Sequence, residues 1–261
     1  MAESDDATPP ATAFPQASTV TDFAANLAAV QATIDATALH AGRNPGDVRL
    51  LAVSKTVPEE RLRLAVQAGC HELGENKVQE AKRKSEAMAD LDISWAIIGH
   101  LQTNKVKDMV PFAAEFHALD RLKLAETLDR RLQAAGRSLD VYVQVNTSGE
   151  DSKYGLPPAA ALPFLRELRA YPSLTVQGLM TLAMSTTDTE RVRGCFRLLR
   201  DLRDRARDED PDLVGPGGLS MGMSGDYPVA IEEGATVVRV GQAIFGARPL
   251  PDSYYWPSAA H

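Results

Sequence analysis

The sequence is poor in cysteine. Its 261 residues include two, Cys70 and Cys195. Two cysteines make neither a disulfide framework nor a metal cluster, and both lie in helical or helix-end contexts, where buried free thiols are the usual outcome. We therefore expect no metal site and a reducing compartment such as the cytoplasm.

An excess of basic residues and long apolar runs are also missing. Lysine and arginine number 28 against 35 acidic residues, which gives a net charge of −7. The basic residues are scattered, so nucleic-acid binding is not expected. No apolar stretch approaches the length of a membrane span, and no basic segment precedes an apolar leader. These features predict a cytoplasmic protein with no membrane or nucleic-acid partner.

What the sequence does have is a regular alternation of strand-like and helix-like segments. With 44% hydrophobic residues, it can build one large α/β barrel or two smaller domains. The predicted strands are 49–55, 71–76, 94–99, 115–120, 140–146, 175–183, 218–222 and 236–245. The predicted helices between them are 59–68, 78–88, 104–112, 121–135, 158–170, 188–208 and 226–233. Eight strands with intervening helices favour a (β/α)8 TIM barrel. The alternative, a doubly wound sheet, lacks its dinucleotide glycine pattern after the first strand.

Both ends of the chain differ from this central region. Residues 1–20 are rich in Ala, Pro, Ser, Thr and Asp, which predicts a disordered tail. An extra N-terminal helix should follow, from Thr21 and Asp22 to about Ala41. Its apolar stripe is Phe23, Leu27, Val30, Ile34 and Ala38. We assign residues 21–248 to the barrel domain and 249–261 to a C-terminal tail.

Lys55 ends the apolar run of the first predicted strand and precedes a helix start at Pro58. The carboxyl ends of parallel strands are where α/β folds place their chemistry. A desolvated lysine there loses part of its preference for the charged form and can form an imine. The alternative is a lysine whose head reaches water along an apolar stem.

The last two predicted units suggest an anion site. Residues 219–226 (LSMGMSGD) are rich in glycine and hydroxyl groups and lead into a helix, where backbone N–H groups and Ser224 can converge on a phosphate. Arg239 lies inside an apolar strand, where an arginine is costly unless it is paired or ligand-bound. Gly241, on the same face, allows close approach of a ligand. Together with Lys55, these residues describe a site for a phosphorylated aldehyde.

Several motifs occur together in one order and resemble a known family. They are 52–56 (AVSKT), 74–80 (GENKVQE), 98–105 (IGHLQTNK), 178–181 (GLMT) and 219–224 (LSMGMS). These segments resemble the pyridoxal 5′-phosphate (PLP) homeostasis proteins, single barrels similar to the N-terminal domain of alanine racemase. The resemblance covers about residues 21–248.

The resemblance implies a cofactor and the residues that hold it. Lys55 would bind PLP as a Schiff base. Ser224 and the backbone of Gly241 and Gln242 would hold the phosphate, Arg239 would face the pyridine nitrogen, and Asn76 and Met223 would lie beside the ring. The family often has a histidine in its third strand where this sequence has Ala96, and His100 is not an aligned substitute.

Three functions follow as hypotheses. The first is a monomeric, non-enzymatic PLP-binding protein of intracellular vitamin B6 and amino-acid balance, with apo PLP-dependent enzymes as candidate recipients. The second is a weak amino-acid racemase. The third is a Schiff-base aldolase. Arg239 can only donate to the ring nitrogen, which weakens carbanion stabilisation. The sequence ends at His261, soon after the eighth predicted strand, so we expect no second domain to supply a racemase base.

Overall fold

The computed structural model describes Phe14 and residues 16–247. Its eight parallel strands form a closed barrel in sequence order, in which β8 pairs with β1. The strands are β1 (Arg49–Val53), β2 (Glu72–Glu75), β3 (Ser94–Ile97), β4 (Ala113–Leu119), β5 (Leu139–Gln144), β6 (Leu174–Met180), β7 (Gly218–Ser220) and β8 (Val237–Val240). The predicted (β/α)8 barrel is confirmed.

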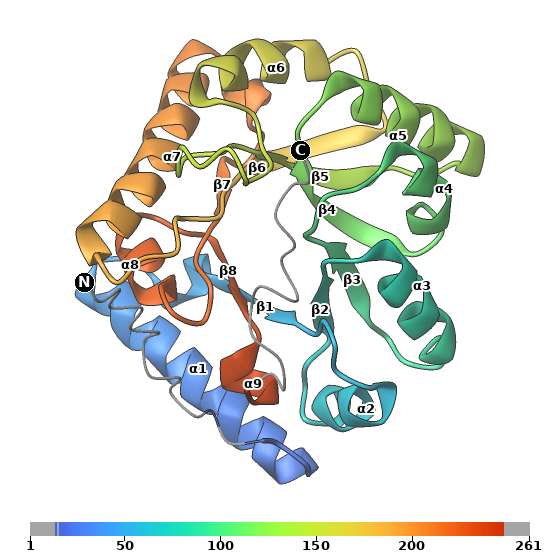
Figure 1. Ribbon diagram of the computed structural model, residues 1–261, viewed down its shortest axis with the longest axis vertical. Coiled ribbons are helices and arrows are strands. Elements are labelled where there is room, and N and C mark those ends of the chain that lie inside the picture. The colour runs from blue at the N-terminus through green and yellow to red at the C-terminus, as the bar shows by residue number, and fades with distance from the viewer. Residues whose placement is uncertain (1–13, 15, 248–261) are drawn as a thin grey trace, which may run out of the picture.

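Helices surround the ring of strands (Figure 1). They are α1 (Val20–His40), α2 (Glu59–Gln67), α3 (Val78–Ala87), α4 (Val106–Met109), α5 (Leu122–Ala135), α6 (Ala161–Leu168), α7 (Thr189–Glu209), α8 (Tyr227–Glu232) and α9 (Gln242–Phe245). Short 3-10 turns occur at Pro45–Asp47, Thr103–Lys105, Pro158–Ala160 and Pro211–Leu213. None of the helices among the described residues has the length and apolar character needed to cross a bilayer.

Glycines end three of these helices as the sequence predicts. Gly69, Gly136 and Gly234 follow α2, α5 and α8 and have φ values of +100°, +62° and +100°. Residues with a Cβ adopt this left-handed region only at a cost, so glycine lets each chain segment turn back toward the next strand.

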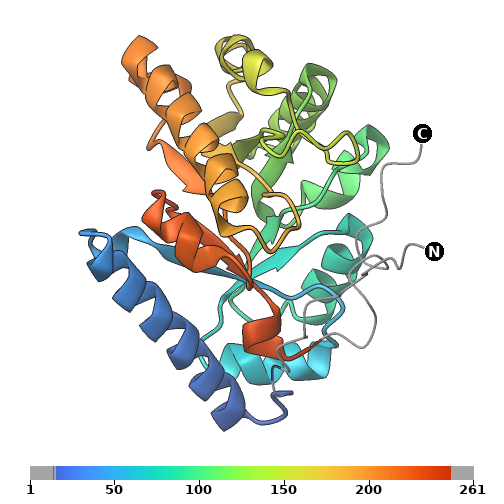
Figure 2. The ribbon, with the colours of Figure 1, turned by 60° about the vertical axis from the view of Figure 1, so that its left-hand side comes forward.

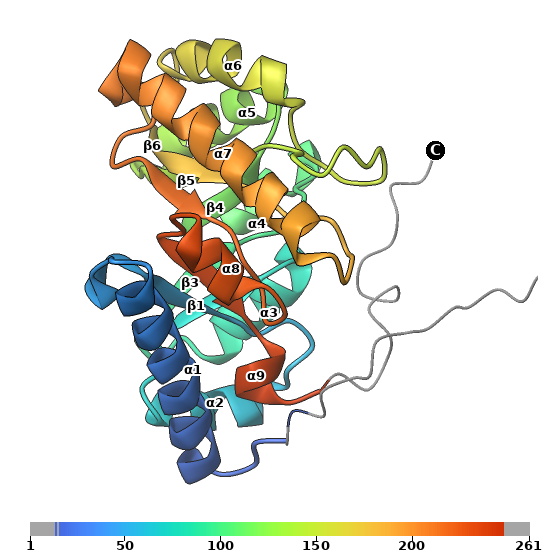
Figure 3. The ribbon, with the colours of Figure 1, turned by 90° about the vertical axis from the view of Figure 1, so that its left-hand side faces the viewer.

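The additional N-terminal helix is confirmed as α1. Thr19 caps it, and Thr19 and Asp22 form a reciprocal capping box. Phe23, Val30 and Ile34 are among its buried residues, and the helix contacts α2, α8 and α9. Figure 2 and Figure 3 show α1 lying along the barrel beside α8 and α9. It therefore covers the outside of the region where the barrel closes.

The described part of the predicted N-terminal tail packs against the barrel. Ala17 is buried, and the Arg61 guanidinium of α2 donates to its carbonyl oxygen at 2.8 Å. The rest of the tail prediction, on residues 1–13 and 15, lies outside the described residues, as does the prediction of a tail at 249–261.

The prediction of one strand over residues 236–245 is wrong at its end. The strand stops at Val240, and Gln242–Phe245 form the short helix α9. The Gly241 carbonyl accepts from the N–H groups of Ile244 and Phe245. Ile244 and Phe245 are buried, and the Phe245 ring lies 5.8 Å from that of Phe23 on α1. A short apolar run suits a strand or a buried helical turn equally well, so the pattern could not separate them.

Candidate functional site

Barrel closure brings Lys55 and Arg239 onto neighbouring strands. Lys55 follows β1, which pairs with β8 so that Leu51 is opposite Arg239 and Ala52 is opposite Val240. Lys55 is 3% exposed and Arg239 is 2% exposed. An amine whose head reached water would be more exposed, so the alternative reading of Lys55 is wrong. The structure thus places two buried basic side chains toward the carboxyl ends of adjacent strands.

The backbone makes an unusual turn directly after Lys55. Thr56 has a φ of +66°, the one positive value among the described residues other than glycine. The Val57 N–H donates to the Ser54 carbonyl at 3.0 Å, which closes the turn around Lys55. The Thr56 N–H donates to Glu80 Oε1 of α3 at 2.7 Å. A left-handed conformation at a β-branched residue is strained and needs such support.

A buried ionic cluster lies behind this turn. Lys84 of α3 is fully buried, and its Nζ donates to Glu75 Oε1 and Glu80 Oε1 at 2.7 Å each and to the Ser54 carbonyl at 2.8 Å. The Ser54 hydroxyl also donates to Glu75 at 2.7 Å. Burial raises the pKa of Glu75 to about 7 even though Lys84 opposes the shift. We name Ser54, Glu75, Glu80 and Lys84 the α3 cluster.

Arg239 is held by neutral groups. Its guanidinium donates to the Ser220 hydroxyl at 2.7 Å and to the Thr181 carbonyl at 2.8 Å. Burial lowers its pKa to about 10, and Asp226 acts against that shift through space. Arg239 therefore stays charged at neutral pH, with its direction fixed from β7 and the end of β6.

A polar chain continues from Arg239 across the barrel. Arg239 can only donate, so the Ser220 oxygen accepts from it. The pKa of Glu115 is lowered to about 2, so its carboxylate can only accept, and neutral His117 carries its proton on Nε2 and donates to Glu115 at 2.7 Å. His117 Nδ1 therefore accepts from the Ser220 hydroxyl, 2.9 Å away. β4 and β7 are not neighbours, so this contact must pass through the barrel interior. Burial lowers the pKa of His117, which favours this neutral form.

The polar chain returns from β4 to β1, the strand next to the one that carries Arg239. Arg49 of β1 donates to both oxygens of Glu115 at 2.7 Å and to Glu72 of β2. Burial alone would raise the pKa of Glu115, but hydrogen bonds from His117 and Arg49 outweigh it and lower the pKa to about 2. We name Arg239, Ser220, His117, Glu115 and Arg49 the interior chain.

The predicted phosphate residues come together after β7 and β8. The Gly241 N–H donates to the Ser224 hydroxyl at 3.2 Å. A Cβ on Gly241 would lie 3.0 Å from the Val53 carbonyl oxygen, so the backbone here packs tightly on β1. Gln242 begins α9, and the first N–H groups of a helix have no acceptor within it. A hydroxyl and backbone N–H groups thus share one small region beside β1, which fits an anionic group.

Asn76 and Met223 are half-buried and follow β2 and β7. Asn76 is fixed by a close backbone approach, since a Cβ on Gly99 would lie 2.1 Å from its carbonyl oxygen. The Met223 N–H donates to Asp226 Oδ1 at 2.5 Å, which shapes the loop before α8. Both positions are compatible with contact to a ligand at the carboxyl ends of the strands.

The departure at Ala96 leaves a buried alanine in β3, opposite Gly74 of β2. His100, which follows β3, instead stacks on Tyr154 with ring centroids 3.9 Å apart. Lys153, next to Tyr154, donates to the Ala183 carbonyl at 2.7 Å and ties the loop after β5 to the segment that follows β6.

Sequence reasoning missed the α3 cluster and the partners of Arg239. Lys84 had a signal: it continues the buried positions Val78 and Ala81 at a spacing of three, ahead of buried Met88. His117 likewise lies within an apolar strand. Glu115 and Ser220 gave no comparable signal, because their contacts depend on the barrel interior.

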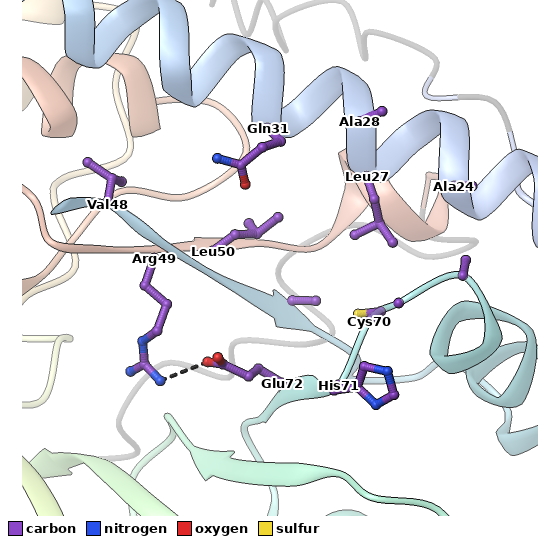
Figure 4. A pocket seen from close by; sticks show the side chains of 13 residues that line it. Ala24, Leu27, Ala28, Gln31, Val48, Arg49, Leu50, Cys70, His71 and Glu72 are labelled. Atoms are coloured by element: carbon purple, nitrogen blue, oxygen red, sulfur yellow. Dashed lines mark hydrogen bonds and ion pairs between the residues drawn. The ribbon is translucent and has the colours of Figure 1, made fainter. Parts of the chain in front are cut away.

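The described residues offer neither a metal site nor a reactive thiol. They contain no group of three His, Cys, Asp or Glu side chains placed to hold a metal ion. Cys70 and Cys195 are free and buried, and burial raises the pKa of Cys70 to about 12. A cavity of about 550 Å³ lies between α1 and the amino ends of β1 and β2, where Arg49 and Glu72 pair (Figure 4). It is at the far end of these strands from Lys55.

Comparison with known proteins gives consistent matches over most of the chain. The alanine racemase N-terminal domain family matches residues 25–249. A pyridoxal phosphate homeostasis protein of Aquifex aeolicus is 43% identical over 208 residues, which cover 80% of this chain and 90% of that protein. One from Pseudomonas aeruginosa is 43% identical over 228 residues, covering 87% and 96%.

Solved structures agree. PipY of Synechococcus elongatus, in its structure with PLP bound, has a TM-score of 0.76 at 34% identity, covering 86% of this chain and 100% of that one. Alanine racemase of Streptomyces lavendulae, with a TM-score of 0.63 at 18% identity, shares the fold and is covered over 59% of its length. This chain therefore belongs to the pyridoxal phosphate homeostasis protein family, built on the barrel of the alanine racemase N-terminal domain.

Proposed function

We propose that this protein binds pyridoxal 5′-phosphate as a Schiff base with Lys55 and acts in PLP homeostasis and amino-acid balance in the cytoplasm. The observation that carries the proposal is the buried Lys55 amine beside the strand that carries Arg239. The names of the relatives and the PLP bound to PipY support the choice of cofactor. When bound, PLP supplies a reactive aldehyde that condenses with an amine.

The residues present fit this cofactor. Ser224, Gly241 and Gln242 would hold the phosphate through a hydroxyl and backbone N–H groups. Arg239 would direct an N–H toward the pyridine nitrogen, which leaves that nitrogen without a proton of its own. Asn76 and Met223 would border the ring. Lys55 would hold the cofactor covalently within a region largely closed to water.

We propose that the protein holds and releases the cofactor and does not turn over a substrate. It would act as a monomer and release PLP to apo PLP-dependent enzymes. Arg239 favours this view because a donor at the ring nitrogen makes the cofactor a weak electron sink. Weak racemisation is the second candidate, and we retain it because the chain shares its fold with alanine racemase. Deuterium exchange at the α-carbon of alanine in heavy water decides between them. Rapid exchange that depends on Lys55 would support a racemase.

Borohydride reduction tests the attachment site. We expect purified protein loaded with PLP to absorb in the visible range, to bleach on reduction, and to carry a pyridoxyl group on Lys55 by peptide mass spectrometry. Lys55→Ala should lose the band and the label, because the amine that forms the imine is gone. Lys82→Ala, which removes a partly exposed lysine of α3, is the matched control and should retain both. A label on another residue, or an unchanged band in Lys55→Ala, would refute the assignment.

A further inference from the structure

Lys55 lies between two backbone groups that the same helix holds. The carbonyl of Ser54, the residue before it, accepts from Lys84 Nζ at 2.8 Å. The N–H of Thr56, the residue after it, donates to Glu80 Oε1 at 2.7 Å. Lys84 and Glu80 also pair with each other at 2.7 Å. One ion pair on α3 is therefore hydrogen-bonded to the backbone on both sides of Lys55.

The burial of this pair distinguishes it from an ordinary pair on a helix surface. The Lys84 side chain has no exposed surface and that of Glu80 is 20% exposed. On the same helix, Lys82 pairs with Asp108 while 43% exposed. A buried ammonium is costly unless carboxylates and further acceptors surround it. The Ser54 carbonyl supplies one of those acceptors, so the Lys84 ammonium contacts the Lys55 turn directly. Lys82, by contrast, pairs with Asp108 of α4.

The conformation of Thr56 is one that needs support from its surroundings. A residue with a Cβ adopts a φ of +66° only at an energetic cost. An acceptor fixed at the Thr56 N–H favours this turn over extended alternatives that would carry Lys55 elsewhere. Glu80 is such an acceptor, and Lys84 fixes its carboxylate.

We propose that Glu80 and Lys84 are positioning residues that hold the Lys55 turn in its left-handed form and thereby set how readily the Lys55 amine captures an aldehyde. This inference rests on the proposed function, since it assigns the aldehyde to PLP. It goes further in tracing the reactivity of Lys55 to two side chains that need not touch the cofactor.

The proposal separates three substitutions that otherwise look alike. Glu80→Ala removes the acceptor for the Thr56 N–H and should weaken PLP binding about tenfold. In free energy, a tenfold change matches the usual cost of a left-handed conformation at a residue with a Cβ. Glu80→Gln retains an amide oxygen that can accept from both Thr56 and Lys84, so most of the affinity should be kept. Thr56→Gly adopts the turn without the Cβ penalty, so adding Glu80→Ala to it should cost clearly less than in the parent protein.

The experiment measures PLP affinity and the rate of borohydride-trapped attachment for these variants, with Lys82→Ala as the control on α3. A second measurement needs no cofactor: trace labelling of the full chain with acetic anhydride across pH, followed at the Lys55 peptide. We expect Glu80→Ala to move the Lys55 labelling profile toward that of an exposed lysine, and Lys82→Ala to leave it unchanged.

The outcomes are distinguishable. If the parent protein binds PLP and Glu80→Ala lowers only the thermal midpoint, with affinity, rate and labelling unchanged, the positioning role is wrong and the α3 cluster serves stability alone. If the parent protein does not bind PLP, the proposed function fails, and the labelling profile still decides whether Glu80 controls the Lys55 amine.

Discussion

Lys84 and Arg239 are both buried cations, yet the fold surrounds them differently. Lys84 Nζ lies 2.7 Å from carboxylate oxygens of both Glu75 and Glu80. Arg239 donates to the Ser220 hydroxyl and the Thr181 carbonyl, which are neutral. The protein itself neutralises the first charge. The second keeps its charge in a region of low dielectric, where an electron-rich ligand atom gains most from it.

This difference predicts how much each buried charge contributes to the stability of the fold. Removing one partner of a buried ion pair leaves an uncompensated charge and is strongly destabilising. Removing a cation whose hydrogen-bond partners are neutral also removes its own desolvation cost. Replacing the cation with methionine should therefore lower the free energy of unfolding strongly at Lys84 and change it little at Arg239.

The largest effect on stability is expected from Lys84→Met. It leaves the buried carboxyl group of Glu75 and the half-buried one of Glu80 without their cation, so the free energy of unfolding should fall by about 3–5 kcal/mol. Urea denaturation of the two proteins measures the loss. Lys82→Met removes the partly exposed partner of Asp108 and should cost less than about 1 kcal/mol. Equal losses in the two variants would mean that burial of Lys84 does not set its contribution.

The pH dependence of stability should separate the carboxylates of the two sites. Burial raises the pKa of Glu75 to about 7 from an ordinary value of 4.5. Between pH 4.5 and about 7 the folded protein holds a proton on Glu75 that the unfolded chain has lost. The contribution of Glu75 to stability therefore decreases as pH rises through this range. Hydrogen bonds from His117 and Arg49 overcome the burial of Glu115 and lower its pKa to about 2. Its contribution is present above pH 4.5 and is lost as pH falls toward 2.

Unfolding free energies measured by urea between pH 3 and pH 8 test this pair. Glu75→Gln should flatten the decrease between about pH 4.5 and 7, while Glu115→Gln should flatten the loss at acid pH and leave the neutral range unchanged. The assignment is wrong if Glu75→Gln alters only the acid side.

The smallest effect on stability is expected from Arg239→Met. The substitution leaves the Thr181 carbonyl without its donor but ends the burial of a guanidinium among neutral groups, so the net change should lie within about 1 kcal/mol. PLP affinity should nevertheless fall, because the donor for the ring nitrogen is gone. Paired urea curves and binding titrations measure both. A loss of stability as large as that of Lys84→Met would make Arg239 a structural charge.

The sequence predicted the barrel and Lys55 and Arg239 as candidates because each of these signals is local. A charge within an apolar strand stands out from its neighbours, as Lys55 and Arg239 do. Lys84 was missed because Lys82 and Arg83 precede it, and its place on the buried stripe shows only at a spacing of three. The roles of Lys55 and Arg239 toward a cofactor remain predictions.

The partners of Arg239 could not be predicted for a different reason. His117 reaches Ser220 across the barrel, between strands that do not pair. Such a contact depends on strand tilt and stagger, which the order of residues along the chain does not reveal. The end of β8 was misjudged because Ile244 and Phe245 are apolar in a strand and in a buried helical turn alike.

Pairing between β1 and β8 has a consequence for the order of folding. Lys55 follows the first strand of the barrel and Arg239 lies in the last, so their juxtaposition requires a contact between segments far apart in the chain. Such contacts carry a large loop-closure entropy and form late. A growing chain would therefore expose the Lys55 amine before it could enclose an aldehyde, and ligand capture would report that the ring of strands has closed. A ligand that binds only this closed form would in turn hold the first and last strands together.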